Sequence, residues 1–285
     1  MKPIVIGVGE YLWDLLPSGR KAGGAPVNFA YHASQNGAEG WAVSAVGKDQ
    51  LGKELLEVSR NHGIKIQVSE VNFPTGTVNV TVVDGQPDYE ICENVAWDHI
   101  PLTQEALELA GKAGAISFGT LAQRHEVSRA TTKALVEAMK EDSLKVYDIN
   151  LRQHFWSKEL IESSLEMANI FKINDDELEI LKGVFEIRDL DTDQACRFFM
   201  DRWNLKMVVL TGGDKFSSIY HEEGVSTLKT PKVEVVDAVG AGDAFSGSLI
   251  GALLNGSGIA EAHKRAVETA AYVCTQAGAW TPARR

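Results

Sequence analysis

The chain has 285 residues, 44% of them hydrophobic, which is enough for one large α/β domain with a sizeable core. The formal net charge of −11 argues against nucleic acid or an anionic membrane as a partner, so a phosphate ligand would depend on local N–H groups and a metal ion. Three scattered cysteines argue against a disulfide framework or a zinc site, and no apolar run suits a signal peptide or a membrane span. We expect a soluble, cytoplasmic protein.

In chain order, short apolar runs alternate with segments that have helical spacing. The apolar runs cover residues 4–8, 41–46, 115–118, 144–149, 170–173 and 207–210. The helical segments include residues 103–112, 126–140, 157–168 and 192–203. Strands that alternate with helices of about ten residues or more predict βαβ units and a mostly parallel sheet. We therefore expect a single α/β domain over residues 1–285.

A hairpin interrupts this alternation. Residues 75–83 alternate between apolar and polar, a turn follows at Asp84-Gly85-Gln86-Pro87, and an extended pattern resumes over 88–95. Because the hairpin lies between two βα units and has polar residues on one face, we expect it to project from the main sheet. We interpret it, together with residues 11–17, as a small β lid over a site. The alternative is an ordinary edge hairpin with no role in closure.

The first polar constellation has the chemistry of a sugar site. Gly23 and Gly24 permit close approach of the backbone to a ligand, Pro26 suits the first turn of a helix, and Asn28 presents both a donor and an acceptor from that turn. Asp14 adds a carboxylate that can accept two hydroxyl hydrogens. Taken alone, the glycines are also compatible with a plain loop and Asp14 with a solvated loop residue.

Further polar residues follow the inner strands. Asp148 and Asn150 come at the carboxyl end of a strand, where open α/β sheets bind ligands, and the planar fork of Arg152 suits a phosphate or a substrate oxygen. The alternative is a capping Asp and a surface Arg.

Two more strand ends carry phosphate or metal chemistry. Asn174 and Glu177 fit a helix capping box, and Glu177 can in addition hold the waters of a bound Mg²⁺. Thr211 and the N–H groups of Gly212 and Gly213 suit a nucleotide phosphate, although a plain β-turn is the simpler interpretation.

The loop over residues 237–243 is the most informative segment. Gly240 and Gly242 precede a helix that has no charged residue between positions 244 and 255, so backbone N–H groups and the helix dipole create an anion site there. A carboxylate at the same place, Asp243, repels an anion unless it has a chemical role, and the simplest role is to take a proton from an attacking hydroxyl. The dinucleotide fingerprint, the P-loop and the GxSxG motif are absent, which argues against an NAD-dependent oxidoreductase and a serine hydrolase.

These motifs, in this order, resemble the ribokinase-like (PfkB-type) carbohydrate kinase family from Gly9 to Gly278. The resemblance implies a Rossmann-like sheet of about eight or nine strands with helices on both faces, plus a β lid. It implies that Asp243 is the catalytic base, and that Gly240, Ala241 and Gly242 form the hole for the transferred phosphoryl group.

The resemblance also implies the ligands. ATP, Mg²⁺ and a sugar are expected, and K⁺ is expected beside the anion hole. The sugar residues would be Asp14, Gly24 and Asn28 with Arg152, and the nucleotide residues Asn174, Thr211 and Gly213. Glu177 and Asn174 would hold Mg²⁺ through water, and backbone carbonyls near Asp237, Val239 and Gly278 would hold K⁺. In similar kinases the lids often pair, so a homodimer through the lid is expected.

The pattern is most similar to that of bacterial fructokinases, which predicts phosphorylation of the 6-hydroxyl of fructose. A kinase of 2-keto-3-deoxygluconate or ribose remains open, as does a sugar- or nucleotide-binding regulator that has lost catalysis. Two positions depart from the family pattern. Ala238 replaces a Thr near the cation loop, and Phe216 replaces a Gly in the nucleotide turn, so K⁺ dependence and nucleotide preference are not determined by the sequence.

Overall fold

The computed structural model describes residues 1–16, 19–83 and 86–283. Within these residues a 9-stranded sheet has the order β13-β12-β11-β10-β9-β8-β1-β4-β5. All neighbours from β11 to β5 run parallel, and β12 and β13 are added antiparallel at one edge. The predicted mostly parallel sheet is therefore confirmed. The strands are β1 (Ile4–Val8), β4 (Glu39–Gly47), β5 (Lys65–Val71), β8 (Ala115–Gly119), β9 (Leu144–Asp148), β10 (Ile170–Asn174), β11 (Met207–Thr211), β12 (Phe216–His221) and β13 (Gly224–Lys229).

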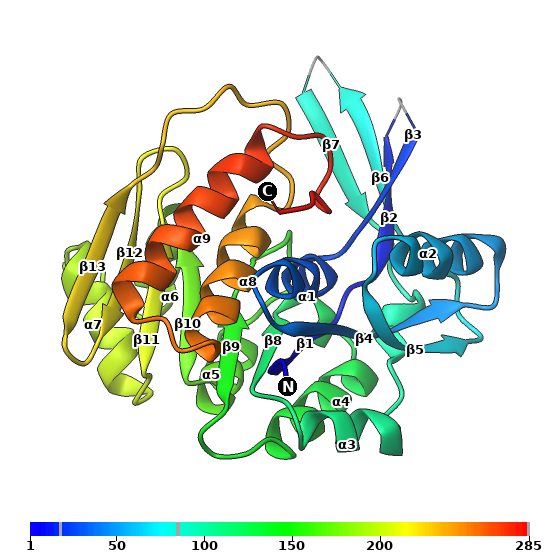
Figure 1. Ribbon diagram of the computed structural model, residues 1–285, viewed down its shortest axis with the longest axis horizontal. Coiled ribbons are helices and arrows are strands. Elements are labelled where there is room, and N and C mark those ends of the chain that lie inside the picture. Colours follow the sequence, from blue (N-terminus) through cyan, green and yellow to red (C-terminus); the bar gives the residue numbers. More distant parts are fainter. Residues whose placement is uncertain (17–18, 84–85, 284–285) are drawn as a thin grey trace.

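Helices cover both faces of this sheet (Figure 1). Side chains alternate along each inner strand, so neighbours such as Val5 and Ile6 belong to different hydrophobic clusters. One cluster joins the sheet to α1, α8 and α9, and the other joins it to α3–α7 around the stacked rings of Phe118, Tyr147 and Phe171. The helices are α1 (Ala25–Gln35), α2 (Gln50–Asn61), α3 (Gln104–Ala110), α4 (Glu126–Glu137), α5 (Lys158–Met167), α6 (Asp175–Val184), α7 (Thr192–Arg202), α8 (Ala241–Leu254) and α9 (Ile259–Cys274), with 3-10 turns at Ala96–His99 and Leu121–Gln123.

A second, small sheet projects from the large one (Figure 1). It has the order β3-β2-β6-β7, with β2 (Leu12–Leu16), β3 (Gly19–Gly23), β6 (Gly76–Val83) and β7 (Gln86–Ile91). The chain enters it from the carboxyl ends of β1 and β5, which places it at the edge of the large sheet where ligands bind in open α/β folds. The expected small sheet is thus present, and its action as a lid stays a prediction. Asp84 and Gly85 of the predicted turn lie outside the described residues.

Four strands were not predicted from the sequence. β3 is polar and glycine-rich, and it forms by pairing with β2. β5 and β13 are edge strands whose side chains are largely solvent-accessible, so neither has an apolar run. β12 is inside the sheet but carries two serines, Ser217 and Ser218, which are both buried with hydrogen-bond partners.

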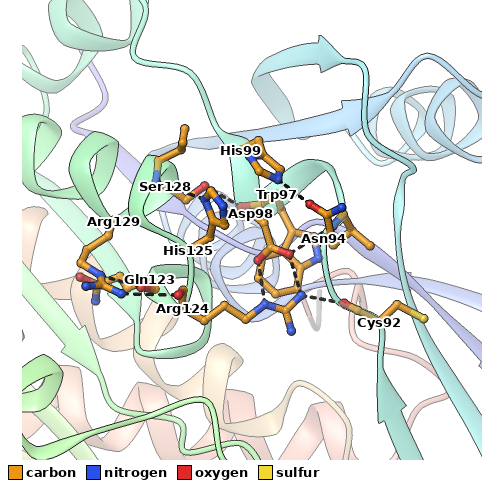
Figure 2. Close-up of polar contacts among 12 residues, drawn as sticks. Cys92, Asn94, Trp97, Asp98, His99, Gln123, Arg124, His125, Ser128 and Arg129 are labelled. Atoms are coloured by element: carbon orange, nitrogen blue, oxygen red, sulfur yellow. Dashed lines mark hydrogen bonds and ion pairs between the residues drawn. The ribbon is translucent and has the colours of Figure 1, made fainter.

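One buried ion pair ties the segment after β7 to the large sheet (Figure 2). Arg124, which follows β8, donates two hydrogen bonds to Asp98 at 2.7 and 2.8 Å and a third, of 2.6 Å, to the Cys92 carbonyl. Its guanidinium also lies over the rings of Trp97 and Phe155, at 4.1 and 4.6 Å from the ring centroids. The side chains of Arg124 and Asp98 are 7% and 2% exposed, so neither charge is solvated if its partner is removed.

Arg124→Met should therefore lower the free energy of unfolding by about 3–5 kcal/mol, because it leaves the Asp98 carboxylate buried and unpaired. Urea denaturation followed by circular dichroism measures the change. Lys133→Met, which breaks the exposed pair with Glu137, should change the stability by less than about 0.5 kcal/mol. Equal effects of the two substitutions would show that the buried pair does not anchor the segment.

Candidate active site

The first turn of α8 forms the centre of the candidate site. Gly240 is the residue before the helix and has a left-handed backbone with φ of 79°. A Cβ added there would lie 2.6 Å from the Cβ of Ala279, so both the positive φ and the lack of room for a side chain require glycine. The first N–H groups of the helix have no acceptor within it, and they carry the positive end of the helix dipole. The predicted anion site therefore has a structural basis.

Asn28 on α1 contacts Asp243 directly. Its amide nitrogen donates a 2.8 Å hydrogen bond to Asp243 Oδ2, and its amide oxygen accepts a 2.7 Å bond from the indole of Trp280. These two partners fix the orientation of the amide. Gly24, at the start of α1, is needed because a Cβ there would lie 2.1 Å from the Glu10 carbonyl oxygen. The glycine therefore lets α1 begin close enough to β1 for Asn28 to reach Asp243.

A buried ion pair balances charge beside the anion site. Lys172 Nζ, from the middle of β10, lies 3.2 Å from Asp148 Oδ1 at the end of β9. A Cβ added to Gly242 would lie 3.4 Å from the same Nζ, so the ammonium faces the first turn of α8. Lys172 therefore places an ammonium group, paired with Asp148, beside the backbone N–H groups that are expected to form an anion hole.

The surroundings of Asp243 strengthen it as a base. Burial and the neighbouring Asp148 carboxylate raise the pKa of Asp243 to about 6, and the Asn28 hydrogen bond, Lys172 and Arg152 oppose the rise. At neutral pH the group is therefore mostly ionised, and it holds a proton more tightly than a solvated carboxylate.

The capping box at α6 is formed, and it brings two strand ends together. Asn174 Oδ1 accepts from Glu177 N at 2.8 Å, and Glu177 Oε2 accepts from Asn174 N at 3.0 Å. Glu177 Oε1 accepts from Leu151 N at 2.8 Å, in the segment that follows β9. Both oxygens of this buried carboxylate thus accept backbone N–H groups, which leaves their remaining lone pairs for a water-held metal ion.

Thr211 pairs with Asn174 in the register of β10 and β11, so these two predicted nucleotide residues are neighbours. Gly213 lies in the turn between β11 and β12, with φ of 56°, and its carbonyl accepts from the Thr230 hydroxyl at 2.9 Å. A Cβ added to Gly212 would lie 2.6 Å from the ring of Phe216. The aromatic ring that departs from the family pattern therefore packs directly on the glycine turn.

Asp237 connects the loop before α8 to two distant segments. Its carboxylate accepts from Val239 N at 3.0 Å and from Gly278 N at 3.1 Å, so the three residues expected around a monovalent cation lie together. Lys21 from β3 of the small sheet contacts the same carboxylate at 2.6 Å. These contacts hold the Asp237 carboxylate in place. Burial alone would raise its pKa, but the hydrogen bonds from Lys21 and the two backbone N–H groups outweigh burial and lower the pKa.

The remaining predicted sugar residues border the same region. A Cβ added to Gly23 would lie 3.7 Å from Asp14 Oδ2 and 4.0 Å from Asn28 Oδ1, so these two side chains share one space. Burial raises the pKa of Asp14, and Lys21 opposes the rise. Arg152 is exposed, and it is close enough to lower the pKa of Asp243.

Three residues of the site were missed in the sequence. Lys172 is a single charge within an apolar strand run, and Glu10 is a single acid shortly after β1, so both carried a visible signal. Trp280 carried none, because its contact with Asn28 spans 252 positions of the sequence.

The fold and the arrangement of these residues are those expected of a ribokinase-like phosphotransferase. The family model for pfkB family carbohydrate kinases matches residues 19–284, and the chain belongs to this family of sugar phosphotransferases. Fructokinase-2 of Solanum lycopersicum is 29% identical over an alignment that covers 95% of this chain and 88% of the relative.

Two further proteins, one compared by sequence and one by structure, are similar to this chain. An ATP-dependent 6-phosphofructokinase of Thermoanaerobacterium thermosaccharolyticum is 28% identical, with 96% of this chain and 89% of the relative covered. The solved structure of a fructokinase with bound ATP from Xylella fastidiosa matches with a TM-score of 0.84 over 99% of this chain and 95% of that chain, at 19% identity. The last comparison shows the shared fold.

Asp148→Asn should lower the pKa of Asp243, because it removes a neighbouring negative charge and leaves Lys172 without its anionic partner. In a ¹³C NMR titration of labelled aspartate carboxyls, the Asp243 resonance should have its midpoint near pH 6 in the wild type and at a lower pH in Asp148→Asn. Loss of the resonance in Asp243→Asn assigns it. Asp201→Asn, the same change at an exposed position of α7, should not move the midpoint. A higher midpoint in Asp148→Asn would contradict the assigned cause.

Proposed function

We propose that this sugar kinase transfers the γ-phosphoryl group of ATP to the primary 6-hydroxyl of fructose. The observation that carries the proposal is the 2.8 Å contact between Asn28 and Asp243. It joins the sugar-type motif of α1 to the carboxylate at the anion site of α8. A hydroxyl bound by the first is therefore delivered to the second. The names of relatives such as the tomato fructokinase-2 support fructose as the sugar.

In this proposal Asp243 is the catalytic base. It orients the primary hydroxyl and takes its proton as the bond to phosphorus forms. The N–H groups of Gly240, Ala241 and Gly242, with the Lys172 ammonium, stabilise the negative charge on the transferred group. Because this positive charge is fixed before the reaction, it requires no rearrangement during transfer.

The sugar and the nucleotide occupy opposite sides of that anion site in the proposal. Asp14, Gly24, Asn28 and Arg152 bind the sugar. Asn174, Thr211 and Gly213 bind the phosphates of ATP. Glu177 and Asn174 hold Mg²⁺ through water. Both Glu177 oxygens already accept hydrogen bonds from backbone N–H groups, which suits contact with the metal's waters rather than with the metal itself. Bound Mg²⁺ supplies neutralising charge to the phosphates.

The loop around Asp237 suits the expected monovalent cation. The backbone carbonyls near Asp237, Val239 and Gly278 are its proposed ligands, and the hydrogen bonds to the Asp237 carboxylate hold the segments together. Ala238 removes the Thr hydroxyl that similar kinases have at this loop.

The small sheet is the proposed lid. Lys21 of β3 contacts Asp237, so the small sheet reaches the loop that precedes the catalytic helix. Closure over the sugar would exclude water, which would otherwise accept the phosphoryl group. Among the described residues β3 and β7 are the edge strands of this sheet, and the proposed homodimer forms through them.

Asp243→Asn should lower kcat by about 10⁴-fold or more, at the upper end of the effect of a general base, because the amide cannot take the proton. Fructose binding, measured by calorimetry, should be retained, since the amide preserves the size of the side chain. Near-normal turnover of this variant would show that Asp243 is not the base.

ADP release, measured in a coupled assay, should be highest with fructose among fructose, ribose, tagatose, 2-keto-3-deoxygluconate and adenosine. Fructose ranking last would overturn the proposed sugar and leave the kinase activity in place. Absence of ADP release with every acceptor, in a protein that still binds sugar, would indicate the non-catalytic regulator.

A further inference from the structure

Glu10 is a buried carboxyl group to which the proposed reaction gives no role. It lies two residues after the end of β1 and is 4% exposed. Its Oε2 atom has no hydrogen-bond partner among the described residues. A buried polar atom without a hydrogen-bond partner lowers the stability of the fold, so its presence in a native structure calls for an explanation.

Glu10 and Asp243 border one small cavity. The cavity has a volume of about 10 Å³ and is also lined by Ser117, Asp148 and Asn150. This volume accommodates one water-sized group, and the polar lining offers the two to four partners that such a group requires. A single water molecule in this cavity would lie beside both carboxyl groups.

Four charged groups lie around Glu10. Burial raises the pKa of Glu10 to about 7, and Asp243 of α8 adds to the rise. Arg152, after β9, and Arg124, after β8, oppose it. Asp148, at the end of β9, lines the same cavity. Burial thus makes the Glu10 carboxylate a stronger proton acceptor than a solvated glutamate.

We propose that Glu10 is a second proton carrier, which acts through Asp243 and takes up the proton that Asp243 removes from the sugar. The inference rests on the proposed function. As the sugar oxygen bonds to the γ-phosphorus, the bond between that phosphorus and the bridging oxygen breaks, and its electron pair leaves with ADP. The hydroxyl proton moves to Asp243 and then, through one water molecule in the cavity, to the Glu10 carboxylate. Asp243 is thereby restored as a base, and solvent takes the proton from Glu10 after the product leaves.

Glu10→Gln keeps the shape of the side chain and removes its ability to take a proton. Its kcat should fall about tenfold to hundredfold, less than the loss of a direct base, while KM for the sugar stays within about twofold. The wild-type plot of log kcat against pH should approach a slope of two at low pH, because both carboxyl groups must be ionised. In Glu10→Gln this slope should become one.

Glu268→Gln, the same change at an exposed position of α9, should leave kcat and the slope unchanged, and urea denaturation checks that each variant is folded. A wild-type slope of one, a Glu10→Gln slope of two, or a large rise in KM with an unchanged kcat would overturn the proposal. Asp243→Asn in the same assay separates the two inferences. If it loses turnover and Glu10→Gln does not, the role of Glu10 alone is wrong, and if Asp243→Asn keeps turnover the proposed base itself fails.

Discussion

The hydrogen bond from Asn28 to Asp243 joins segments that are 215 positions apart in the sequence, and the site depends on this contact. It holds a carboxylate at the positive end of α8, near the ion pair of Asp148 and Lys172. The balance keeps Asp243 ionised near neutral pH yet more basic than a solvated aspartate. Removal of any one of these neighbours changes the proton affinity of the group that is proposed to start the reaction.

The C-terminal segment and the small sheet support this contact from outside. His32 binds the Ala279 carbonyl at 2.7 Å, and the next residue, Trp280, fixes the amide of Asn28. Lys21 reaches from the small sheet to Asp237, three residues before Gly240. Helix α1, the C-terminal segment and the projecting sheet therefore converge on the region around the first turn of α8. A change in the position of the small sheet would reach the anion site through the Asp237 loop.

Features that depend on local sequence patterns could be predicted from the sequence, and contacts between distant segments could not. The inner strands and the capping box at Asn174 follow from periodicity and spacing, and the structure contains them. Strand β3 is polar and glycine-rich, so it shows no strand pattern even though its partner β2 directly precedes it in the chain. The contact of Trp280 depends on a partner 252 positions away, which no local pattern indicates. Gly24 is predicted to give a ligand access to the backbone, and the structure adds a second reason for a glycine there, which is its close packing on the Glu10 backbone. The sugar and cation roles of the site residues remain proposals.

Phosphorus NMR of the product formed from ATP and fructose tests the central claim most directly, because it locates the transferred group on the sugar. The account predicts one sugar phosphate whose phosphorus couples to the two protons on C6, formed in step with ADP. Coupling to the C1 protons would contradict the proposed acceptor hydroxyl. Inorganic phosphate as the only product would contradict sugar phosphorylation itself.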